Sequence, residues 1–214
     1  MILTKRDRHI LLTVARFRLA LGRQIKALCG FNGQRAMDRR LKLLIENGYM
    51  TRNRVIYGVA GIYNITAKAK KELDIPLPIS KQRLDQIAHD IAVIDTAIYL
   101  IQAGETTLAQ IQTEKELRHK QGFSNRGHEP DFIYTKGGQT ICVEAELSLK
   151  AKDRLMKNLK NNYLKYDVQK WVIPEHKQAI YEIVSKAGVE YPNIEIVSLE
   201  TVRSAIKEGA GDIE

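Results

Sequence analysis

The sequence predicts an α+β or α/β protein built from two parts, and three observations lead to this expectation. Helical spacing followed by short strands fills the first 65 residues, whereas helices and strands alternate after residue 80. Pro76 and Pro78 interrupt the pattern where a linker is expected. Residues 1–80 hold 16 Lys and Arg against 5 Asp and Glu, a net +11, and residues 81–214 hold 18 against 20, a net −2. We therefore expect one domain over 1–78 and a second over 79–214.

The first part begins with three predicted helices. Thr4 is a suitable N-cap for an amphipathic helix over 5–17. Its expected buried face is Ile10, Leu11, Val14 and Phe17. A short helix over 23–29 follows, and a third helix begins after Asn32-Gly33 and runs to about residue 47. The expected buried stripe of the third helix is Ala36, Leu41, Leu44 and Ile45.

A β-hairpin is predicted after the third helix, from a strand at 48–52 and a glycine-containing run over 55–65. Three helices followed by a hairpin indicate a winged helix-turn-helix, in which the third helix enters the major groove of DNA and the wing contacts the backbone or minor groove. The net +11 agrees with this, because phosphate contacts supply most sequence-independent affinity for DNA. A basic surface that only aids solubility is the alternative. The expected DNA contacts are Gln34, Arg35, Arg39 and Arg40 on the third helix, with Arg52 and Arg54 in the wing.

The second part is predicted to alternate helices and strands. Ser80 is the expected cap of a long helix that runs to about Ala103, and a strand is expected near 107–113. The expected elements that follow are strands around Asp131 and Glu144, a helix over 151–164, a strand over 170–173, a helix over 177–187, a strand over 194–197 and a helix near 200–208. The αβββαβ order at the start of this series is the minimal core of a restriction-endonuclease-like domain.

Acidic residues lie at the start of one predicted strand and on the next. Residues alternate sides along a strand, so Glu144 and Glu146 are expected to point the same way, near Asp131, while the residues between them enter the core. Carboxylates held together in an apolar sheet repel one another unless a cation or a proton neutralises them. Mg²⁺ or Mn²⁺ takes such oxygen ligands, so the sequence predicts a metal site at these three acids. The alternative is that they only form ion pairs with nearby lysines and Arg154.

An acid, a turn at Gly137-Gly138 and then Glu144-x-Glu146 resembles the core motif of PD-(D/E)xK nucleases. Further motif residues are spread over the whole chain: Leu3-Thr4, Arg6-Asp7-Arg8, Ile10-Leu11, Arg39-Arg40-Leu41, Leu44, Gly48-Tyr49, Tyr63, Ile65-Thr66, His89-Asp90, His128, Pro130-Asp131 and Val143-Glu144-x-Glu146-Leu147-Ser148, with Lys150 and Arg154 beyond. On these residues the sequence resembles the replication-relaxation family and the related MOBC-type relaxases of mobilisable plasmids and integrative elements.

The resemblance implies a protein that binds an origin of transfer or replication and nicks or relaxes it in a metal-dependent reaction. It also implies a place in the site for His128. The nucleases of this class carry a lysine two residues after the strand acid, where this chain has Glu146. Lys150 or Lys152 is therefore expected to stabilise the charge that develops during cleavage.

We therefore expect a two-domain, metal-dependent DNA endonuclease that nicks or relaxes duplex DNA, with relaxosome or transfer proteins as further partners. The rival expectation is an accessory or regulatory DNA-binding protein whose degenerate nuclease domain serves dimerisation. The missing lysine favours this rival and the retained acids oppose it. An RNA-binding factor has less support, since no aromatic stacking motif accompanies the basic surface. Whether the chain forms a homodimer is left open.

Composition narrows the class of protein further. No apolar run is long enough to span a membrane and no signal-peptide pattern opens the chain, so a cytoplasmic protein without a membrane partner is expected. Cys29 and Cys142 are expected as buried thiols and not as a disulfide framework or zinc ligands. Tyr134, Tyr163 and Tyr166 are expected in the core rather than as nucleophiles.

Overall fold

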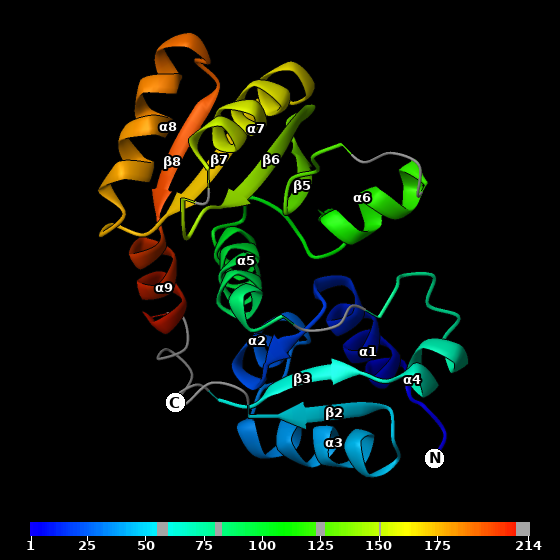
Figure 1. The fold of residues 1–214 in the computed structure, drawn as a ribbon. Coiled ribbons are helices and arrows are strands. Elements are labelled where there is room, and N and C mark those ends of the chain that lie inside the picture. The colour runs from blue at the N-terminus through cyan, green and yellow to red at the C-terminus, as the bar shows by residue number, and fades with distance from the viewer. Residues whose placement is uncertain (55–59, 80–82, 123–126, 150, 209–214) are drawn as a thin grey trace. The chain divides into compact units, whose positions relative to one another are not determined.

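The computed structural model describes residues 1–54, 60–79, 83–122, 127–149 and 151–208, and within them the protein is mixed α+β, as predicted (Figure 1). The chain divides into two compact units, residues 1–94 and 95–214. This division lies within α5 (Leu84–Gln102), whereas the sequence places its boundary at 78/79, which stays a prediction. No described helix is both long enough and apolar enough to cross a membrane.

The first unit combines helices with a small antiparallel sheet whose strand order is β1-β3-β2. Its elements before α5 are α1 (Lys5–Phe17), β1 (Ala20–Leu21), α2 (Gly22–Leu28), α3 (Gln34–Glu46), β2 (Met50–Asn53), β3 (Ile62–Ile65) and α4 (Ala67–Glu72). The three predicted helices are thus confirmed within a few residues. Residues 55–59 of the predicted hairpin, and the predicted cap Ser80, lie outside the described residues.

The apolar spacing of α1 and α3 sets the core of the first unit. The predicted face of α1 is buried, with Ile10, Leu11 and Val14 at 0% exposure. On α3, Leu41 and Leu44 are buried as predicted and Ile45 is half-buried. The prediction for Ala36 is wrong, because Ala36 is exposed and its neighbour Met37 is buried. The buried stripe is therefore Met37, Leu41 and Leu44, at positions i, i+4 and i+7 of one helix face.

A buried ion pair joins α1 to α3. Thr4 caps α1 as predicted, because its Oγ1 accepts from the Asp7 N–H (3.3 Å) and its own N–H donates to the Asp7 carboxylate (2.7 Å). The Asp7 side chain is fully buried, and the Arg40 guanidinium donates to both of its oxygens. Burial alone raises the pKa of Asp7, but the hydrogen bonds from Arg40 and Thr4 outweigh it and hold the pKa below its ordinary value.

The second unit is built on a five-stranded sheet of order β4-β5-β6-β7-β8. Its elements after α5 are β4 (Gln112–Thr113), α6 (Glu114–Gln121), β5 (Phe132–Lys136), β6 (Gln139–Ala145), α7 (Lys152–Lys165), β7 (Val168–Ile173), α8 (Gln178–Glu190), β8 (Ile194–Ser198) and α9 (Leu199–Glu208). The strands from β5 onward and their helices match the predicted order. The predicted strand near 107–113 shortens to two residues, and α6 is a helix that the sequence interpretation missed.

Strand β6 is the centre of this sheet and carries the predicted site. It pairs antiparallel with β5 and parallel with β7. Helix α7 is the crossover connection between the parallel strands β6 and β7. Helices α7 and α8 cover one face of the sheet, where they pack on β7 (Figure 1). That core contains Leu155, Leu159, Trp171, Ile173, Ile180, Val184, Ala187 and Tyr191. Because residues 141–145 are all buried, β6 has no exposed face for chemistry, and Glu144 lies on the face that α7 and α8 cover.

A two-residue turn closes the β5–β6 hairpin. Lys136 pairs with Gln139, which leaves Gly137 and Gly138 as the loop. Their φ angles are +58° and +82°, and a two-residue hairpin turn of this kind needs positive φ at both positions. The predicted Gly-Gly turn is confirmed, and it fixes the register in which Phe132 faces Val143.

Loss of the Asp7–Arg40 pair should destabilise the first unit. We expect Asp7→Ala to lower the free energy of unfolding by about 2–3 kcal/mol, because it removes the capping box and leaves the Arg40 cation without its buried partner. Since the folded pKa of Asp7 is depressed, its contribution is present above the unfolded pKa and is lost as pH falls through the folded pKa. The difference between wild type and variant should therefore shrink below about pH 4.

Urea unfolding at neutral and acidic pH measures both effects. Asp38→Ala is the matched control, because Asp38 is an exposed acid on α3 that bonds only to Gln34 among the described contacts. We expect this control to change stability by less than about 0.5 kcal/mol. Equal losses in the two variants would contradict the role assigned to the ion pair.

Candidate functional site

The hairpin brings two of the predicted carboxylates together at one end of β5 and β6. Phe132 pairs with Val143, so Asp131 stands opposite Glu144, one step beyond the end of β5. The Asp131 Oδ2 accepts a hydrogen bond from the Ala145 N–H at 2.8 Å, which fixes Asp131 against β6. The adjacency of these two acids follows from the register of the hairpin.

The Glu144 carboxylate is enclosed by donors from two other segments. Its Oε1 lies 2.5 Å from His128 Nε2 and 2.9 Å from the Asn162 Nδ2 of α7. The Glu144 side chain is 10% exposed and His128 is 18% exposed. We call His128, Asp131, Glu144 and Asn162 the carboxylate cluster. Three of its members come from the hairpin and the segment that leads into it, and the fourth comes from the helix packed over β6.

Burial controls the protonation of the cluster. It raises the pKa of Glu144, the hydrogen bond from His128 opposes this, and the charge of Asp131 raises the pKa further, so that it lies above its ordinary value. For His128 burial alone lowers the pKa, but the hydrogen bond and charge of Glu144, with the charge of Asp131, outweigh it and raise the pKa. The cluster therefore tends to keep protons that the free side chains would release, which is the kind of perturbation found at functional sites.

A second buried carboxylate holds the segment that carries His128 and Asp131. Glu129 is buried, and its oxygens accept from Lys165 Nζ at 2.7 and 3.0 Å and from Gln121 Nε2 at 2.8 Å. Arg118 of α6 also donates to the Gly127 carbonyl at 3.2 Å. The segment 127–131 is thus tied to α6 on one side and to the end of α7 on the other.

The remaining predicted site residues do not complete a three-acid site. Glu146 lies beyond the end of β6, where its N–H donates to the Val172 carbonyl (3.0 Å) and the strand alternation no longer sets its direction. Among the described residues no group of three or more His, Cys, Asp or Glu side chains is arranged to hold a metal ion. Lys152 is exposed at the first position of α7, Lys150 falls outside the described residues, and His89 pairs with Asp90 on α5.

Asp131 and Glu144 nevertheless suit a hard divalent cation as a pair. Mg²⁺ is often bound by one or two carboxylates and completes its shell with waters and substrate phosphate, so a third protein carboxylate is not required. Burial is the main cause of the raised pKa of Glu144, and the negative charge of Asp131 adds to it. A bound cation would relieve the repulsion between the two carboxylates, which is the fit between this pair and the predicted metal.

The predicted DNA-contact residues of the first unit differ in exposure and in whether their side chains already have a partner within the protein. Arg35 on α3 is exposed and has no described partner for its guanidinium, and Arg39 is exposed with a long hydrogen bond (3.4 Å) to the Arg35 carbonyl. Arg40 forms the buried ion pair with Asp7 and so stabilises the fold. The sequence did not indicate this role, because Arg40 lies among other basic residues on α3. Gln34 bonds to Asp38, Arg52 lies over the Tyr63 ring (5.6 Å), and Arg54 is exposed.

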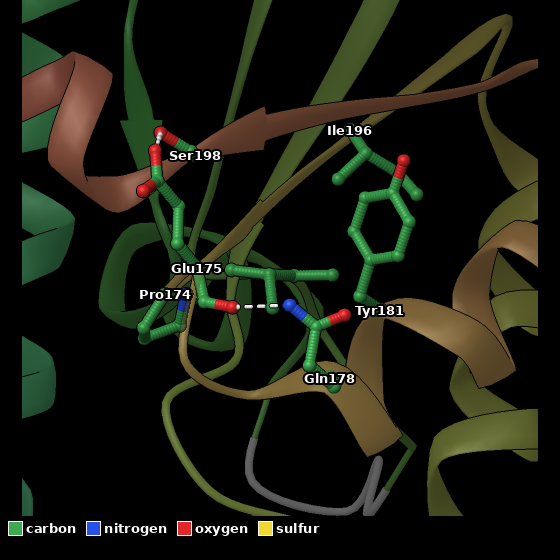
Figure 2. A pocket seen from close by; sticks show the side chains of 7 residues that line it. Pro174, Glu175, Gln178, Tyr181, Ile196 and Ser198 are labelled. Carbon is green, nitrogen blue, oxygen red and sulfur yellow. Dashed lines mark hydrogen bonds between the residues drawn. The ribbon is translucent and has the colours of Figure 1, made fainter.

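A separate pocket of about 170 Å³ opens at the carboxyl ends of β7 and β8. Figure 2 shows its lining, in which the Tyr181 ring stands beside Ile196 and Glu175 accepts from the Ser198 hydroxyl at 2.9 Å. The Gln178 amide donates to the Glu175 carbonyl at 2.9 Å. These polar groups satisfy one another, and none of the predicted site residues lines the pocket. The carboxylate cluster is therefore the stronger candidate site.

Sequence interpretation missed Asn162, Glu129, Lys165 and α6. One signal for Asn162 was present, because it follows Leu155 and Leu159 at the i+7 position of the buried stripe of α7, where an amide needs a polar partner. A signal for α6 was the Thr113-x-x-Glu116 capping-box pattern, in which the Thr113 N–H and hydroxyl both donate to the Glu116 carboxylate, at 2.8 and 2.9 Å. The cysteines are buried as predicted, and burial raises the pKa of Cys29 to about 11. Tyr134 is buried as predicted, but Tyr163 is 40% exposed, so its placement in the core was wrong.

Comparisons with family models, with curated proteins and with solved structures found no match to this chain. The resemblance to the replication-relaxation family therefore rests on the motif residues themselves and stays a prediction.

The pKa shifts of the cluster predict how stability depends on pH. Both Glu144 and His128 have raised folded pKa values, so each contributes stability below its unfolded pKa that is lost as pH rises through its folded pKa. In EDTA we expect the melting temperature of wild type to fall as pH rises above the ordinary glutamate pKa of about 4.3, and Glu144→Gln to be more stable than wild type at alkaline pH.

Thermal melts of both proteins across that range test this expectation. Glu182→Gln is the matched control, because Glu182 is an exposed glutamate on α8 with no described partner. The control should follow the wild-type curve. A Glu144→Gln variant that is less stable than wild type at alkaline pH would show that the ionised carboxylate stabilises the fold.

Proposed function

We propose that the protein binds duplex DNA and cleaves one of its strands in a metal-dependent reaction, as a nicking endonuclease or relaxase. The observation that carries this proposal is the pairing of Asp131 and Glu144 at adjacent positions of a hairpin, with His128 bonded to Glu144. An origin of transfer or replication in a mobile element is the proposed target, and the motif resemblance is its support. Relaxosome or transfer proteins are the proposed partners.

The proposal assigns DNA binding to the first unit as a winged helix-turn-helix. Its support is the order α1-β1-α2-α3-β2-β3 with an antiparallel β2–β3 pair, which is the order of that fold. In such a domain α3 enters the major groove, and β2 and β3 flank the wing. Arg35 and Arg39 are the contacts best supported on α3, with Arg52 and Arg54 at the wing. Arg40 is left out because Asp7 occupies it.

The proposal assigns strand cleavage to the carboxylate cluster in the second unit. Asp131 and Glu144 would hold Mg²⁺ or Mn²⁺. The metal would supply an activated water and polarise the scissile phosphate. His128 and Asn162 orient the Glu144 carboxylate through Oε1, and His128 Nε2 can hold or release a proton beside it. Lys152 is the described lysine proposed to meet the developing negative charge.

A non-catalytic DNA-binding protein is the second candidate function, and one observation favours it. Both carboxylates are already satisfied by protein donors: Asp131 by the Ala145 N–H, and Glu144 by His128 and Asn162. A structural hydrogen-bond network would have the same appearance, and the second unit would then serve dimerisation or regulation. Cleavage in the presence of metal separates the two candidates.

Conservative removal of either carboxylate should abolish nicking and spare binding. We expect Asp131→Asn and Glu144→Gln to lower the rate of nicking of supercoiled plasmid in Mg²⁺ or Mn²⁺ by more than about 100-fold, beyond the 10- to 100-fold typical of groups that only orient a ligand. Affinity for a duplex measured in EDTA should stay within about twofold of wild type, because the proposed duplex contacts belong to the first unit and both acids belong to the second. Glu182→Gln is the control for both assays. Wild-type protein that binds its origin but never nicks it would support the non-catalytic candidate.

The proposed role of α3 predicts a change in salt dependence. We expect Arg35→Glu with Arg39→Glu to weaken duplex binding and to reduce the slope of log affinity against log salt by about 1.8, since each phosphate contact contributes about 0.9. Fluorescence anisotropy over a range of KCl concentrations measures the slope. Lys70→Glu with Lys71→Glu on α4 is a control with the same change in charge. Equal slopes for the two variants would argue against α3 as the DNA-binding helix.

A further inference from the structure

Helix α7 concentrates positive charge in a unit that is otherwise acidic. Residues 95–214 hold 16 Lys and Arg against 18 Asp and Glu, a net −2, yet α7 alone has five basic residues and one acid, a net +4. Lys165 is engaged by Glu129. The other four are exposed, and within the described part of the chain none has an ion-pair partner: Lys152, Arg154, Lys157 and Lys160.

The outward side of α7 also exposes apolar side chains next to this charge. Leu164 is 73% exposed and Tyr163 is 40% exposed, with its ring centroid 5.1 Å from that of Tyr191. At about 100° per residue, Lys157, Lys160, Tyr163 and Leu164 fall within one arc of about 120°. We call these four residues the α7 surface. The opposite side of the helix is buried and includes Leu155, Leu159 and Asn162.

We propose that the α7 surface binds single-stranded DNA. Proteins that hold single strands combine cations that follow the phosphates with exposed aromatic groups on which bases stack, and the α7 surface has both. Lys157 and Lys160 would contact the phosphates, and Tyr163 with Leu164 would meet an unstacked base. The inference rests on the proposed function in one respect. Asn162 of α7 donates to Glu144, so a DNA strand bound on α7 would lie along the helix that supports the carboxylate cluster.

Charge and apolar exposure together favour a single strand over other polyanions. In duplex DNA the bases are stacked inside the double helix, so they are not available to contact Tyr163 and Leu164. An anionic membrane would require a deeper apolar face, and the apolar stripe of α7 is already packed against β7 and α8. Duplex binding is assigned to α3 in the first unit, so the two activities have separate surfaces and separate variants.

The test compares the affinity of the full-length protein for a single strand of about 16 nucleotides, the upper end of common site sizes, and for the matching duplex. Anisotropy is measured in EDTA over a range of KCl concentrations. We expect Lys157→Glu with Lys160→Glu to weaken single-strand binding at least tenfold and to reduce its salt slope by about 1.4, at about 0.7 per contact. Duplex affinity should change by less than about threefold, because α3 is intact.

Two further variants separate charge from stacking. Lys186→Glu with Arg203→Glu reverses two exposed charges on α8 and α9 that have no described partner, and it should leave single-strand affinity within about twofold of wild type. Tyr163→Leu keeps an apolar contact for Tyr191 but removes the ring. It should weaken single-strand binding by roughly fivefold or more without changing the salt slope. Thermal melts verify that each variant is folded.

Equal losses in the two double variants would overturn the inference, because overall charge would then explain them. Wild-type protein that binds vesicles containing phosphatidylserine but no single strand would also overturn it. A third outcome is possible: the wild-type protein does not nick DNA but binds single strands, and the Lys157→Glu, Lys160→Glu variant loses that binding. This outcome would count against the proposed nicking function and would support this inference. The two proposals can therefore fail separately.

Discussion

The second unit is organised around one costly feature, a carboxylate at the buried centre of a sheet. Charged oxygens in an apolar environment are stable only when hydrogen-bonded, paired or neutralised. Glu144 meets this requirement through His128 and Asn162, which come from the segment before β5 and from the crossover helix α7. Displacement of either α7 or that segment would remove one of the two donors to the carboxylate. The requirement therefore ties the position of α7 to the chemistry of β6, and the same helix completes the core and the site.

The segment that carries His128 and Asp131 depends on a second buried carboxylate in the same way. Glu129 draws Lys165 and Gln121 towards it from the ends of α7 and α6, so the segment is held from both sides. A site residue on an irregular segment is held in place only as firmly as its neighbours hold that segment. Glu144 and Glu129 thus have different roles. One presents oxygens at the site, and the other keeps the groups around it in place.

Local patterns predicted most of the fold, and tertiary packing accounts for what they missed. The helices α1, α3 and α7 follow from apolar spacing, and the β5–β6 hairpin follows from alternation around two glycines. Helix α6 is short and highly charged, so its signal was confined to one capping box. The opposition of Asp131 and Glu144 could be predicted because it is a property of a single hairpin. The contact between Glu144 and Asn162 depends on the rotation of the crossover helix α7 about its own axis on the sheet. The ion pair between Arg40 and Asp7 depends on how α3 packs against α1. Neither contact can be predicted from a local sequence pattern.

The Gly137-Gly138 turn has a consequence for the tolerance of this chain to insertions and deletions. Side chains alternate along β6, so a change of one residue between the turn and Glu144 would exchange its two faces. Val143 would then turn towards α7, and the glutamate would be driven into the opposite apolar layer. A change of two residues would keep the faces but slide the carboxylate by about 7 Å along the sheet, out of step with Asp131. This tight turn therefore accommodates length variation poorly, although it lies at the far end of the hairpin from the acids.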